Sequence, residues 1–284
     1  SAAKVRRVSY GHCTCKNGSN TMAIVGGILL IISLILFFVR ASKLKKIGCI
    51  RSARSSTTHE IQTIASTVAQ DIGAGSWQDY VKVYGKVACD NPLHSEEKKV
   101  ACAYYKTKVT REYEEITTQK DDQGKTVKKT EKHTETISEI TRSQPFHLVD
   151  ATGKIEVQPE DAAIETVEIL SEFRPESHRS SKISIGGFSL STQKHTTGKG
   201  RTLGYKYEES ILPLGREALV IGMATDATSQ LSIRKPTDNK QQFIISLKAD
   251  GELTHEISRH AQQAFYAMLG CLGAGTTLVA VGLL

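Results

Sequence analysis

The stretch FHLVDATGKIEV, residues 146–157, contains the strongest short-range fold signal in the chain. Apolar and polar residues alternate on both sides of a central Asp-Ala-Thr-Gly, a pattern typical of two antiparallel strands joined by a tight turn. In such a turn the side chain of Asp150 can accept backbone N–H bonds, and Gly153 can adopt a positive φ. We therefore predict a hairpin with a structural turn at Asp150 and Gly153.

Two further segments extend this hairpin into a sheet. They are VKVYGKV at residues 81–87 and ALVIGMA at residues 218–224, the latter followed by QLSIR at residues 230–234. The first two carry a glycine in mid-strand, Gly85 and Gly222, which lets a curved strand bend into a closed barrel. The pieces predict a mainly β fold with flanking helices (α+β), built on an OB-like β-barrel body, a fold that does not by itself imply nucleic-acid binding.

A long β-ribbon is predicted as an insertion after the first barrel strand. Strand patterns at residues 101–115 and 126–141 flank the turn Asp-Asp-Gln-Gly-Lys, and both faces of the ribbon are polar. We expect the ribbon, residues 101–141, to project into solvent. It is either a contact surface for a partner or a solvent-exposed insertion without a binding role.

A second unusual region is the loop at residues 175–204, which is basic and rich in Ser and Thr. We predict a mobile loop, with a short strand at residues 182–185, that touches lipid headgroups or a partner protein. The candidate contact residues in it are Arg179, Lys182, Lys194, Lys199 and Arg201.

Residues 57–72 are predicted to form an amphipathic helix. Thr57 and Glu60 have the spacing of a capping box, and a Gly-Ala-Gly stretch ends the pattern. The helix is expected to dock on the β body, with lying on the lipid surface as the alternative. Its apolar stripe comprises Ile61, Ile64, Ala65, Val68 and Ile72.

Two uncharged runs bracket the body. Residues 22–39, MAIVGGILLIISLILFFV, would reach roughly 27 Å as a helix, close to the hydrocarbon thickness of a bilayer. Residues 265–284 are also uncharged and are rich in small residues, with Gly270-x-x-x-Ala274 at a spacing that suits close helix packing in lipid. We predict two transmembrane helices; the alternatives are buried core helices and, for the first run, a signal peptide.

Charge indicates how the chain sits in the membrane. The formal net charge is +7, and basic residues follow the first apolar run directly. This predicts a body that faces the cytoplasm or stroma, and contact with anionic lipid rather than nucleic acid. The candidate lipid or partner contacts of this cluster are Arg40, Lys43, Lys45 and Lys46.

The N-terminal segment and the cysteines complete the organisation. Residues 1–20 are basic with no acid, as in the remnant of an organelle transit peptide. The six cysteines form no Cys-x-x-Cys pair, so no metal or cofactor site is predicted, and whether Cys89 and Cys102 bond is left open. The predicted order is a basic tail (1–21), a transmembrane helix (22–39), an amphipathic helix (57–72), a β domain (77–248), a helix (250–264) and a second transmembrane helix (265–284).

Several motifs resemble one known family. They are Tyr104-Tyr105 with VTREYEE at residues 109–115, the hairpin already described with Pro159 after it, ESILPLG at residues 209–215 and FIIS at residues 243–246. Together they resemble the GIDE domain family over about residues 80–284 and the apolar run before them. The family includes ubiquitin ligases of mitochondrial and chloroplast outer membranes, with two spans and a zinc-binding RING after the second, and shorter relatives of cyanobacterial type without a RING.

Two functions follow from the sequence. The first is a two-span membrane protein that acts by protein–protein contact, as a subunit, adaptor or assembly factor in an organelle membrane complex, with a plastid thylakoid favoured over the envelope. The second is a membrane-bound RING-type ubiquitin ligase whose RING is missing from this sequence. No catalytic motif is identified, so enzymatic activity is left open, as is homo-oligomerisation. Membrane lipid and other membrane protein subunits are the expected partners.

Overall fold

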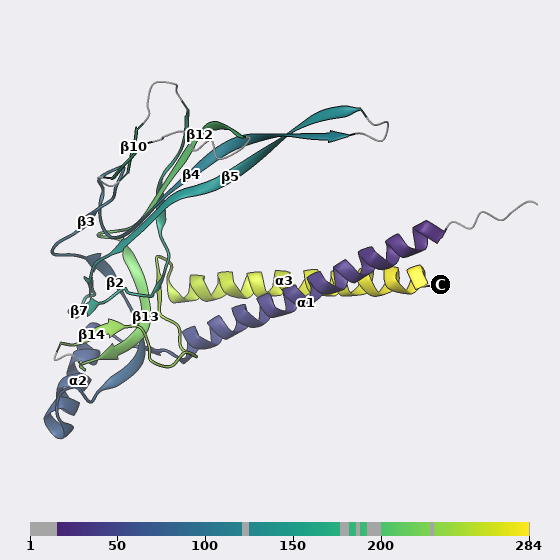
Figure 1. The fold of residues 1–284 in the computed structure, drawn as a ribbon. Helices are drawn as coiled ribbons and strands as arrows, with labels where there is room; N and C mark the ends of the chain where they lie inside the picture. The colour runs from purple at the N-terminus through teal and green to yellow at the C-terminus, as the bar shows by residue number, and fades with distance from the viewer. Residues whose placement is uncertain are drawn as a thin grey trace, which may run out of the picture. The chain divides into compact units, whose positions relative to one another are not determined.

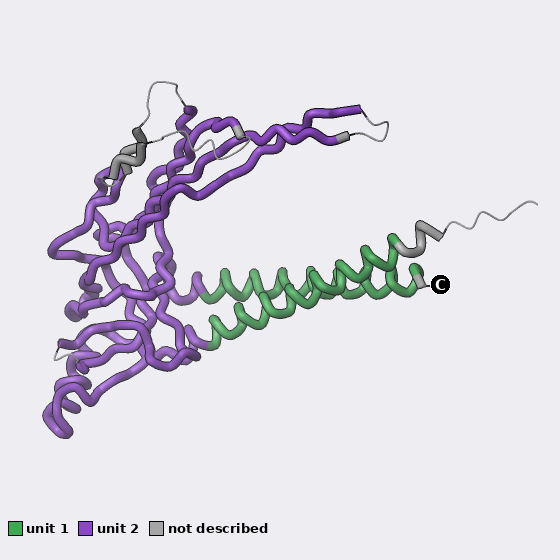
Figure 2. The backbone as a smooth tube through the Cα atoms, viewed as in Figure 1, with its two compact units in different colours: residues 1–48, 254–284 green, residues 49–253 purple. Residues whose placement is uncertain are grey.

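A computed structural model gives the fold of the protein in two compact units (Figure 2). One unit comprises Ser1–Gly48 and Thr254–Leu284, and the other comprises Cys49–Leu253. The structure describes residues 16–120, 125–176, 182–185, 188–191, 200–227 and 230–283. Residues 1–15 of the predicted N-terminal tail, the tip of the ribbon and Arg179, Lys194 and Lys199 lie outside the described residues. The rest of the predicted tail, from Lys16, already belongs to a helix.

The predicted barrel is present in the Cys49–Leu253 unit as a closed ring of five strands (Figure 1). Around the ring these are β2 (Gln78–Ala88), β6 (Phe146–Val149), β7 (Lys154–Val157), β14 (Ser232–Arg234) and β13 (Glu217–Thr225). The ring closes because β13 pairs along β2 from Glu217 opposite Lys86 to Thr225 opposite Gln78. Only β7 and β14 run parallel, and the other four pairings are antiparallel. This strand order and these directions are those of an OB barrel, so the predicted fold class is confirmed.

Close packing explains the two mid-strand glycines, against backbone at Gly85 and against side chains at Gly222. A Cβ on Gly85 would lie 2.6 Å from the carbonyl oxygen of Val149, and a Cβ on Gly222 would lie 2.8 Å from a methyl group of Ile233. Neither position has room for a side chain, since real Cβ contacts are essentially never so short. The interior they border is fully apolar and includes Val81, Val83, Phe146, Leu148, Val220 and Ile233.

Helix α2 (Thr58–Ile72) packs against the barrel, as the sequence predicts. The Thr57 hydroxyl accepts from the Glu60 N–H and the Glu60 carboxylate accepts from the Thr57 N–H, which completes the capping box. Ile61 and Ala65 belong to the barrel core, with Ile64 and Val68 at its margin. Ile72 does not share this face, because its side chain is 70% exposed.

Three short strands widen the barrel sheet. β1 (Arg54–Ser55) runs parallel to β2, β15 (Ile244–Ser246) pairs with β13, and β8 (Ala163–Ile164) runs parallel to β15. Two long insertions interrupt the barrel. One lies between β2 and β6, and the other lies between β7 and β13.

The two insertions together form a second sheet. It contains β9 (Val167–Pro175), β12 (Gly200–Pro213) and β4 (Ala101–Lys120) in that order, with β3 (Leu93–His94) and β5 (Thr126–Ser143) both paired to the far side of β4. Val109, Leu170 and Tyr207 form one small core cluster on this sheet, and Cys102, Tyr105 and Ile211 form another.

The predicted loop at residues 175–204 is partly wrong. β9 extends to Pro175 and β12 already begins at Gly200, while β10 (Lys182–Ile185) and β11 (Phe188–Ser191) form an antiparallel hairpin within the range. The strand predicted at residues 182–185 is confirmed. Basic and Ser-rich composition did not indicate the second strand of this hairpin, which is FSLS.

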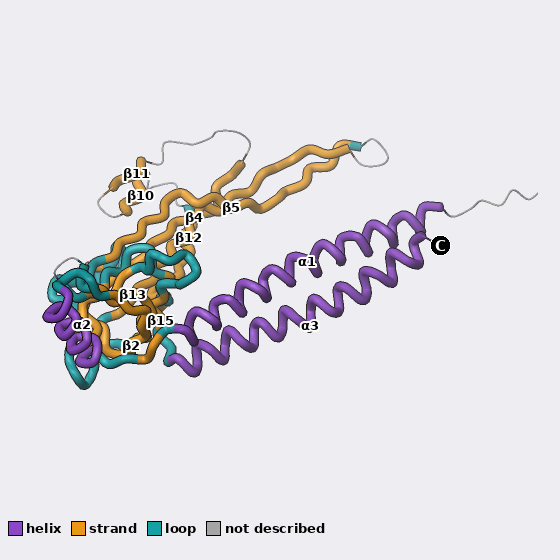
Figure 3. Tube along the Cα trace, turned by 90° about the horizontal axis from the view of Figure 1, so that it is seen from below, coloured by secondary structure: helices purple, strands orange, loops and turns teal. Residues whose placement is uncertain are grey.

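The other unit is an antiparallel pair formed by α1 (Lys16–Ser52) and α3 (Asp250–Leu283), which run side by side in Figures 1 and 3. The hydroxyl of Ser33 donates to the Met268 carbonyl at 3.2 Å, and the Arg40 guanidinium lies 4.5 Å from the Phe265 ring centroid. The closest backbone approach involves Gly26 and Gly275 rather than the predicted Gly270 and Ala274, which are exposed.

Both helices are long and apolar enough to span a membrane, over Thr21–Ser52 and Asp250–Gly282. Only 11% and 6% of their most apolar windows are buried, which argues against the alternative of buried core helices. The helices also continue beyond the apolar runs. The part of α1 from Arg40 to Ser52 adds about 20 Å, and the part of α3 before Phe265 adds a similar length.

Candidate functional site

The turn at Asp150 does more than close the β6–β7 hairpin. The Asp150 carboxylate accepts from the N–H groups of Thr152 (2.7 Å) and Gly153 (2.9 Å) within the turn. It also accepts from the N–H and the hydroxyl of Thr58, both at 2.8 Å. Thr58 is the first residue of α2, so this carboxylate ties the helix to the barrel at the end where the helix dipole favours negative charge.

The hydrogen bonds of Asp150 control its protonation. Burial raises the pKa of a carboxyl group, but the bonds from Thr152 and Thr58 outweigh that effect and lower the pKa of Asp150 to about 2. The group is therefore ionised at every physiological pH, and its role is structural.

The predicted reason for Gly153 is wrong. The described glycines with positive φ are Gly73, Gly75 and Gly215, and Gly153 is not among them. A Cβ on Gly153 would instead lie 3.0 Å from the Thr58 hydroxyl oxygen, a tight contact with the side chain that binds Asp150. Glycine is therefore required at this position because α2 packs closely against it, and not because the backbone adopts a positive φ.

The ribbon formed by β4 and β5 is the most exposed feature of the Cys49–Leu253 unit (Figures 1 and 3). β5 pairs with β4 from Tyr104 opposite Ser143 to Lys120 opposite Thr126. β12 accompanies β4 only as far as Glu115, opposite Gly200. Beyond that point the ribbon has two strands, and we call residues 116–120 with 125–130 the outer ribbon.

The outer ribbon exposes both faces and one long edge. Ile116 is 53% exposed on one face and Val127 is 47% exposed on the other. In the described part of the sheet, β5 pairs with β4 alone, so its other backbone edge is open. An open edge can accept a further strand from a partner, and lysines on it discourage unselective pairing. Those on β5 are Lys128, Lys129 and Lys132.

A row of side-chain contacts stiffens the ribbon where it leaves the sheet. The guanidinium of Arg111 donates to the Thr202 hydroxyl at 2.8 Å and lies 4.8 Å from the Tyr113 ring centroid. Tyr113 stacks on His133 of the opposite strand, with ring centroids 5.5 Å apart. These cross-strand contacts hold the base of the ribbon to the three-stranded part of the sheet.

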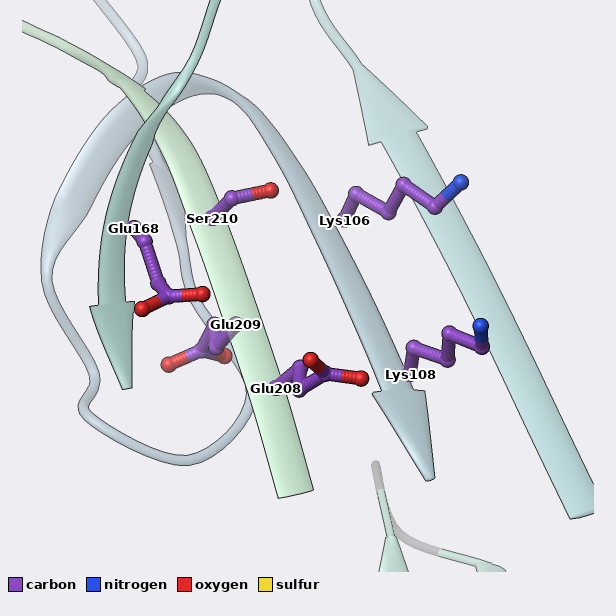
Figure 4. Close-up of a pocket in the computed structure, with 6 residues that line it drawn as sticks. All are labelled: Lys106, Lys108, Glu168, Glu208, Glu209 and Ser210. Carbon is purple, nitrogen blue, oxygen red and sulfur yellow. The ribbon is translucent and has the colours of Figure 1, made fainter. Parts of the chain in front are cut away.

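A hollow of about 250 Å³ lies on the second sheet (Figure 4). Its lining combines Lys106 and Lys108 of β4 with Glu168, Glu208, Glu209 and Ser210 of β9 and β12. Lys106 pairs with Glu139 at 2.6 Å, and Lys206 pairs with Glu208 at 2.6 Å. Charges of both signs compensate one another here, as on an ordinary solvated face.

Glu209 is a structural residue that the sequence analysis missed. Its carboxylate accepts from the N–H groups of Glu97 (2.9 Å) and Lys98 (3.0 Å) and from the Thr107 hydroxyl (3.1 Å). The side chain is 1% exposed. Its position between Tyr207 and Ile211, both inward on a period of two, is the signal that could have identified a buried carboxylate.

The predicted basic contacts do not all belong to one unit. In α1, Lys43 and Lys45 are exposed, whereas Arg40 and Lys46 are half-buried. Arg201 is exposed near the start of β12, with its backbone opposite Glu114 of β4, and Lys182 is the first residue of β10. Whether these residues contact lipid or protein stays a prediction.

The described cysteines and acidic residues do not form a metal centre. Among the residues that the structure describes, no three His, Cys, Asp or Glu side chains are placed to hold a metal ion. Cys89 and Cys102 are both free thiols. Burial raises the pKa of the Cys102 thiol to about 11, so it is not a reactive thiolate.

The geometry defines a class of protein: an OB-like barrel with a projecting ribbon, whose chain continues at both ends into a pair of apolar helices. A family model described as "GIDE: E3 Ubiquitin ligase" matches residues 114–281. The chain therefore belongs to the GIDE family and, with its two candidate spans, is a membrane protein of that family. The match begins within β4, later than residue 80, where the resemblance is expected to start. No curated protein and no solved structure matches the chain.

Proposed function

We propose that this GIDE-family protein acts by protein–protein contact, as a subunit, adaptor or assembly factor of a membrane complex. The outer ribbon is the observation that carries this proposal. It exposes both faces and an open backbone edge, and it contributes nothing to the described core clusters. The outer ribbon adds nothing to these core clusters, whereas addition of a strand to its edge or contact through its faces would give it a role.

The register of the ribbon allows a clean test. Glu115 and Glu131 are directly opposite each other, so residues 116–130 can be replaced by a two-residue Asn-Gly turn without changing the pairing below. A tagged variant of this kind should lose most of the partner protein recovered from native membranes with the wild-type chain. Its heat stability should stay close to wild type, because the described side chains among those removed are almost all exposed.

A matched control separates the paired strands of the outer ribbon from the turn that joins them. Lys120 and Thr126 are also opposite each other, so an Asn-Gly turn between them removes only the intervening residues. We expect this control to retain the partner. Undiminished recovery with the shorter ribbon would show that the outer ribbon is decoration and would refute the proposed contact.

We further propose that the membrane is an organelle membrane, with the plastid thylakoid favoured and the β unit on the stromal or cytoplasmic side. The transit-like composition of residues 1–20 and the basic residues after the first apolar run support this. Membrane fractionation tests the location. Protease added to sealed membranes of known orientation should digest the β unit, and complete protection would reverse the topology.

A ubiquitin ligase is the second candidate function, favoured by the description of the matching family. A RING needs two zinc sites, each with four Cys or His ligands, and the described residues contain no such cluster. The test is ubiquitin transfer by the natural full-length protein, together with its zinc content. Stoichiometric zinc and transfer of ubiquitin from a conjugating enzyme would establish the ligase over the adaptor.

A further inference from the structure

One long backbone edge of the Cys49–Leu253 unit is open in the described part of the chain: the side of β5 that faces away from β4. Pairing with β4 is regular along residues 126–136 of β5 and is interrupted by a bulge at Ile137. We call residues 126–136 the β5 edge. All of its side chains are exposed except those of Glu131 and His133, which are half-buried. This edge can therefore be approached by another strand along its whole length.

The β5 edge can pair with a second copy of itself in only a few registers. Two copies related by a two-fold axis would join these edges as antiparallel strands. In an antiparallel pair, the backbone groups of two directly opposite residues point either toward each other or away from each other. Because this orientation alternates along a strand, the axis must pass beside one residue that lies opposite its own counterpart.

The charges of the β5 edge select one of these registers. With Lys132 opposite its counterpart, Lys129 of each copy lies opposite Glu135 of the other, and Glu131 lies opposite His133. A register centred on Glu131 would place two glutamates together, and one centred on His133 would place Glu131 opposite Glu135 twice. Centres further along the strand in either direction shorten the regular pairing. Opposite charges directly across two strands stabilise the pair, and like charges destabilise it.

The charged residues that would meet in this register are accessible in the single chain. The side chains of Lys129 and Glu135 are 58% and 56% exposed. Lys129 pairs with Glu131 of its own strand at 2.7 Å, and Arg111 lies 3.5 Å from Glu135. A carboxylate has two oxygens with several acceptor positions, so Glu135 can accept from Arg111 and from Lys129 of a second copy at the same time.

The other residues of the edge also match in this register. Thr130 lies opposite Thr134, a cross-strand pair that is favourable, and the exposed side chain of Val127 meets exposed Ile137 at each end of the paired stretch. Only Lys132 meets a like charge, at the axis itself. Lysines on an open edge discourage pairing with strands that do not carry matching acids, so the register gains selectivity from them.

We propose that two copies of this chain form a two-fold symmetric dimer through their β5 edges, with Lys132 at the axis. The second sheets of the two copies then continue into each other across the interface. This inference goes beyond the proposed adaptor function and does not rest on it, because a second copy covers the edge of β5 and leaves the faces of the outer ribbon to a different protein.

Analytical ultracentrifugation of the purified full chain in detergent, over a series of concentrations, measures self-association without any other protein. Lys129→Glu and Glu135→Lys each place like charges together twice in the interface, so each variant should associate about tenfold or more weakly than wild type. A mixture of the two variants should form a dimer with one chain of each, since every altered charge then meets its opposite.

Lys128→Glu is the matched control. It makes the same change of charge one residue away, opposite Thr136, and should associate like wild type. A chain that stays monomeric at every concentration would overturn the proposal. A dimer that Lys129→Glu leaves intact, or a mixture of the two variants that does not associate, would also overturn it, the former because self-association would then use another surface.

Cysteine cross-linking tests the position of the axis. Residues directly opposite each other in an antiparallel pair have Cα atoms about 4.5–5.5 Å apart, within the range of a disulfide. Lys132→Cys should therefore give a cross-linked dimer on oxidation with diamide. Thr130→Cys should not, because it lies four residues, about 13 Å, from its own counterpart, whereas its mixture with Thr134→Cys should cross-link. Equal cross-linking of Lys132→Cys and Thr130→Cys alone would refute the register.

Discussion

The barrel and the outer ribbon are both built from antiparallel β-strands but have opposite relations to solvent. In the barrel every strand of the five-membered ring has two neighbours, and Val81, Leu148, Val220 and Ile233 are fully buried. In the outer ribbon each strand has one neighbour, and its apolar residues Ile116 and Val127 are about half exposed. A substitution in the closed barrel therefore disturbs packing against several residues at once. A substitution in the outer ribbon disturbs contact with one cross-strand partner.

The largest effect is expected from Gly85→Val in the barrel. The new Cβ would lie 2.6 Å from a backbone oxygen of β6, which cannot move without opening the ring. We expect a loss of about 3 kcal/mol or more in unfolding free energy, or failure to fold. Thr118→Val places the same side chain in the outer ribbon and should be close to neutral. The single tryptophan, Trp77, lies in the barrel core and reports unfolding of both variants by fluorescence.

If both variants unfolded at the same denaturant concentration, the closed ring and the open ribbon would not differ as the structure shows. A stable Gly85→Val would mean that β2 and β6 lie further apart than their pairing requires.

Asp150→Ala tests the link between the barrel and α2. It removes the acceptor for Thr58, Thr152 and Gly153, and we expect a loss of about 2 kcal/mol after allowance for solvent access to the turn. Thermal unfolding of the wild type and the variant at neutral pH measures this loss.

The same link predicts a pH dependence. The pKa of Asp150 is about 2 in the folded state, below the value of about 3.9 for an unfolded Asp, so its ionised form stabilises the fold above the unfolded pKa. That contribution should disappear as the pH falls from about 5 to about 2. The difference in stability between wild type and Asp150→Ala should shrink over this interval, and a constant difference would contradict the assigned hydrogen bonds.

The barrel could be predicted from the sequence because a closed barrel requires residue patterns that can be recognised within short segments. Alternating residues, mid-strand glycines at Gly85 and Gly222 and the Asp-x-Thr-Gly turn all lie within single strands or hairpins. The OB-like architecture and the inserted ribbon could therefore be predicted from short segments. The hairpin of β10 and β11 could not, since neither its composition nor its alternation differs clearly from that of a polar loop.

Long-range contacts were the part that sequence reasoning missed. The pairing of Asp150 with Thr58 joins residues 92 positions apart, and Glu209 binds a loop more than 100 positions away. The sequence carries no period or motif that connects such residues. In the helices, small residues were correctly expected to allow close packing, but helical phase selected Gly275 over Gly270.

Gly153→Val measures how far steric contact alone constrains the hairpin. Because φ at Gly153 lies outside the left-handed region, the variant avoids backbone strain and only crowds the Thr58 side chain. We expect a loss of about 1–2 kcal/mol, less than for Gly85→Val. Measured against Thr58→Ala alone, the double variant Gly153→Val with Thr58→Ala should lose less stability than Gly153→Val does in the wild type, since the crowded hydroxyl oxygen is then absent. A loss as large as that of Gly85→Val would show that backbone strain is present after all.

The smallest effects should come from the outer ribbon. Ile116→Thr and Lys128→Ala change exposed side chains, and Ile116 faces only Thr130 across the ribbon. Each variant should lie within about 0.5 kcal/mol of wild type, as is usual for surface positions. Denaturant unfolding followed at Trp77 checks this, because that residue lies in the barrel core. The comparison becomes sharper in native membranes, where Ile116→Thr should reduce partner recovery although it leaves stability unchanged. An exposed isoleucine that could be lost without effect on either measurement would leave the ribbon edge, and not its faces, as the contact surface.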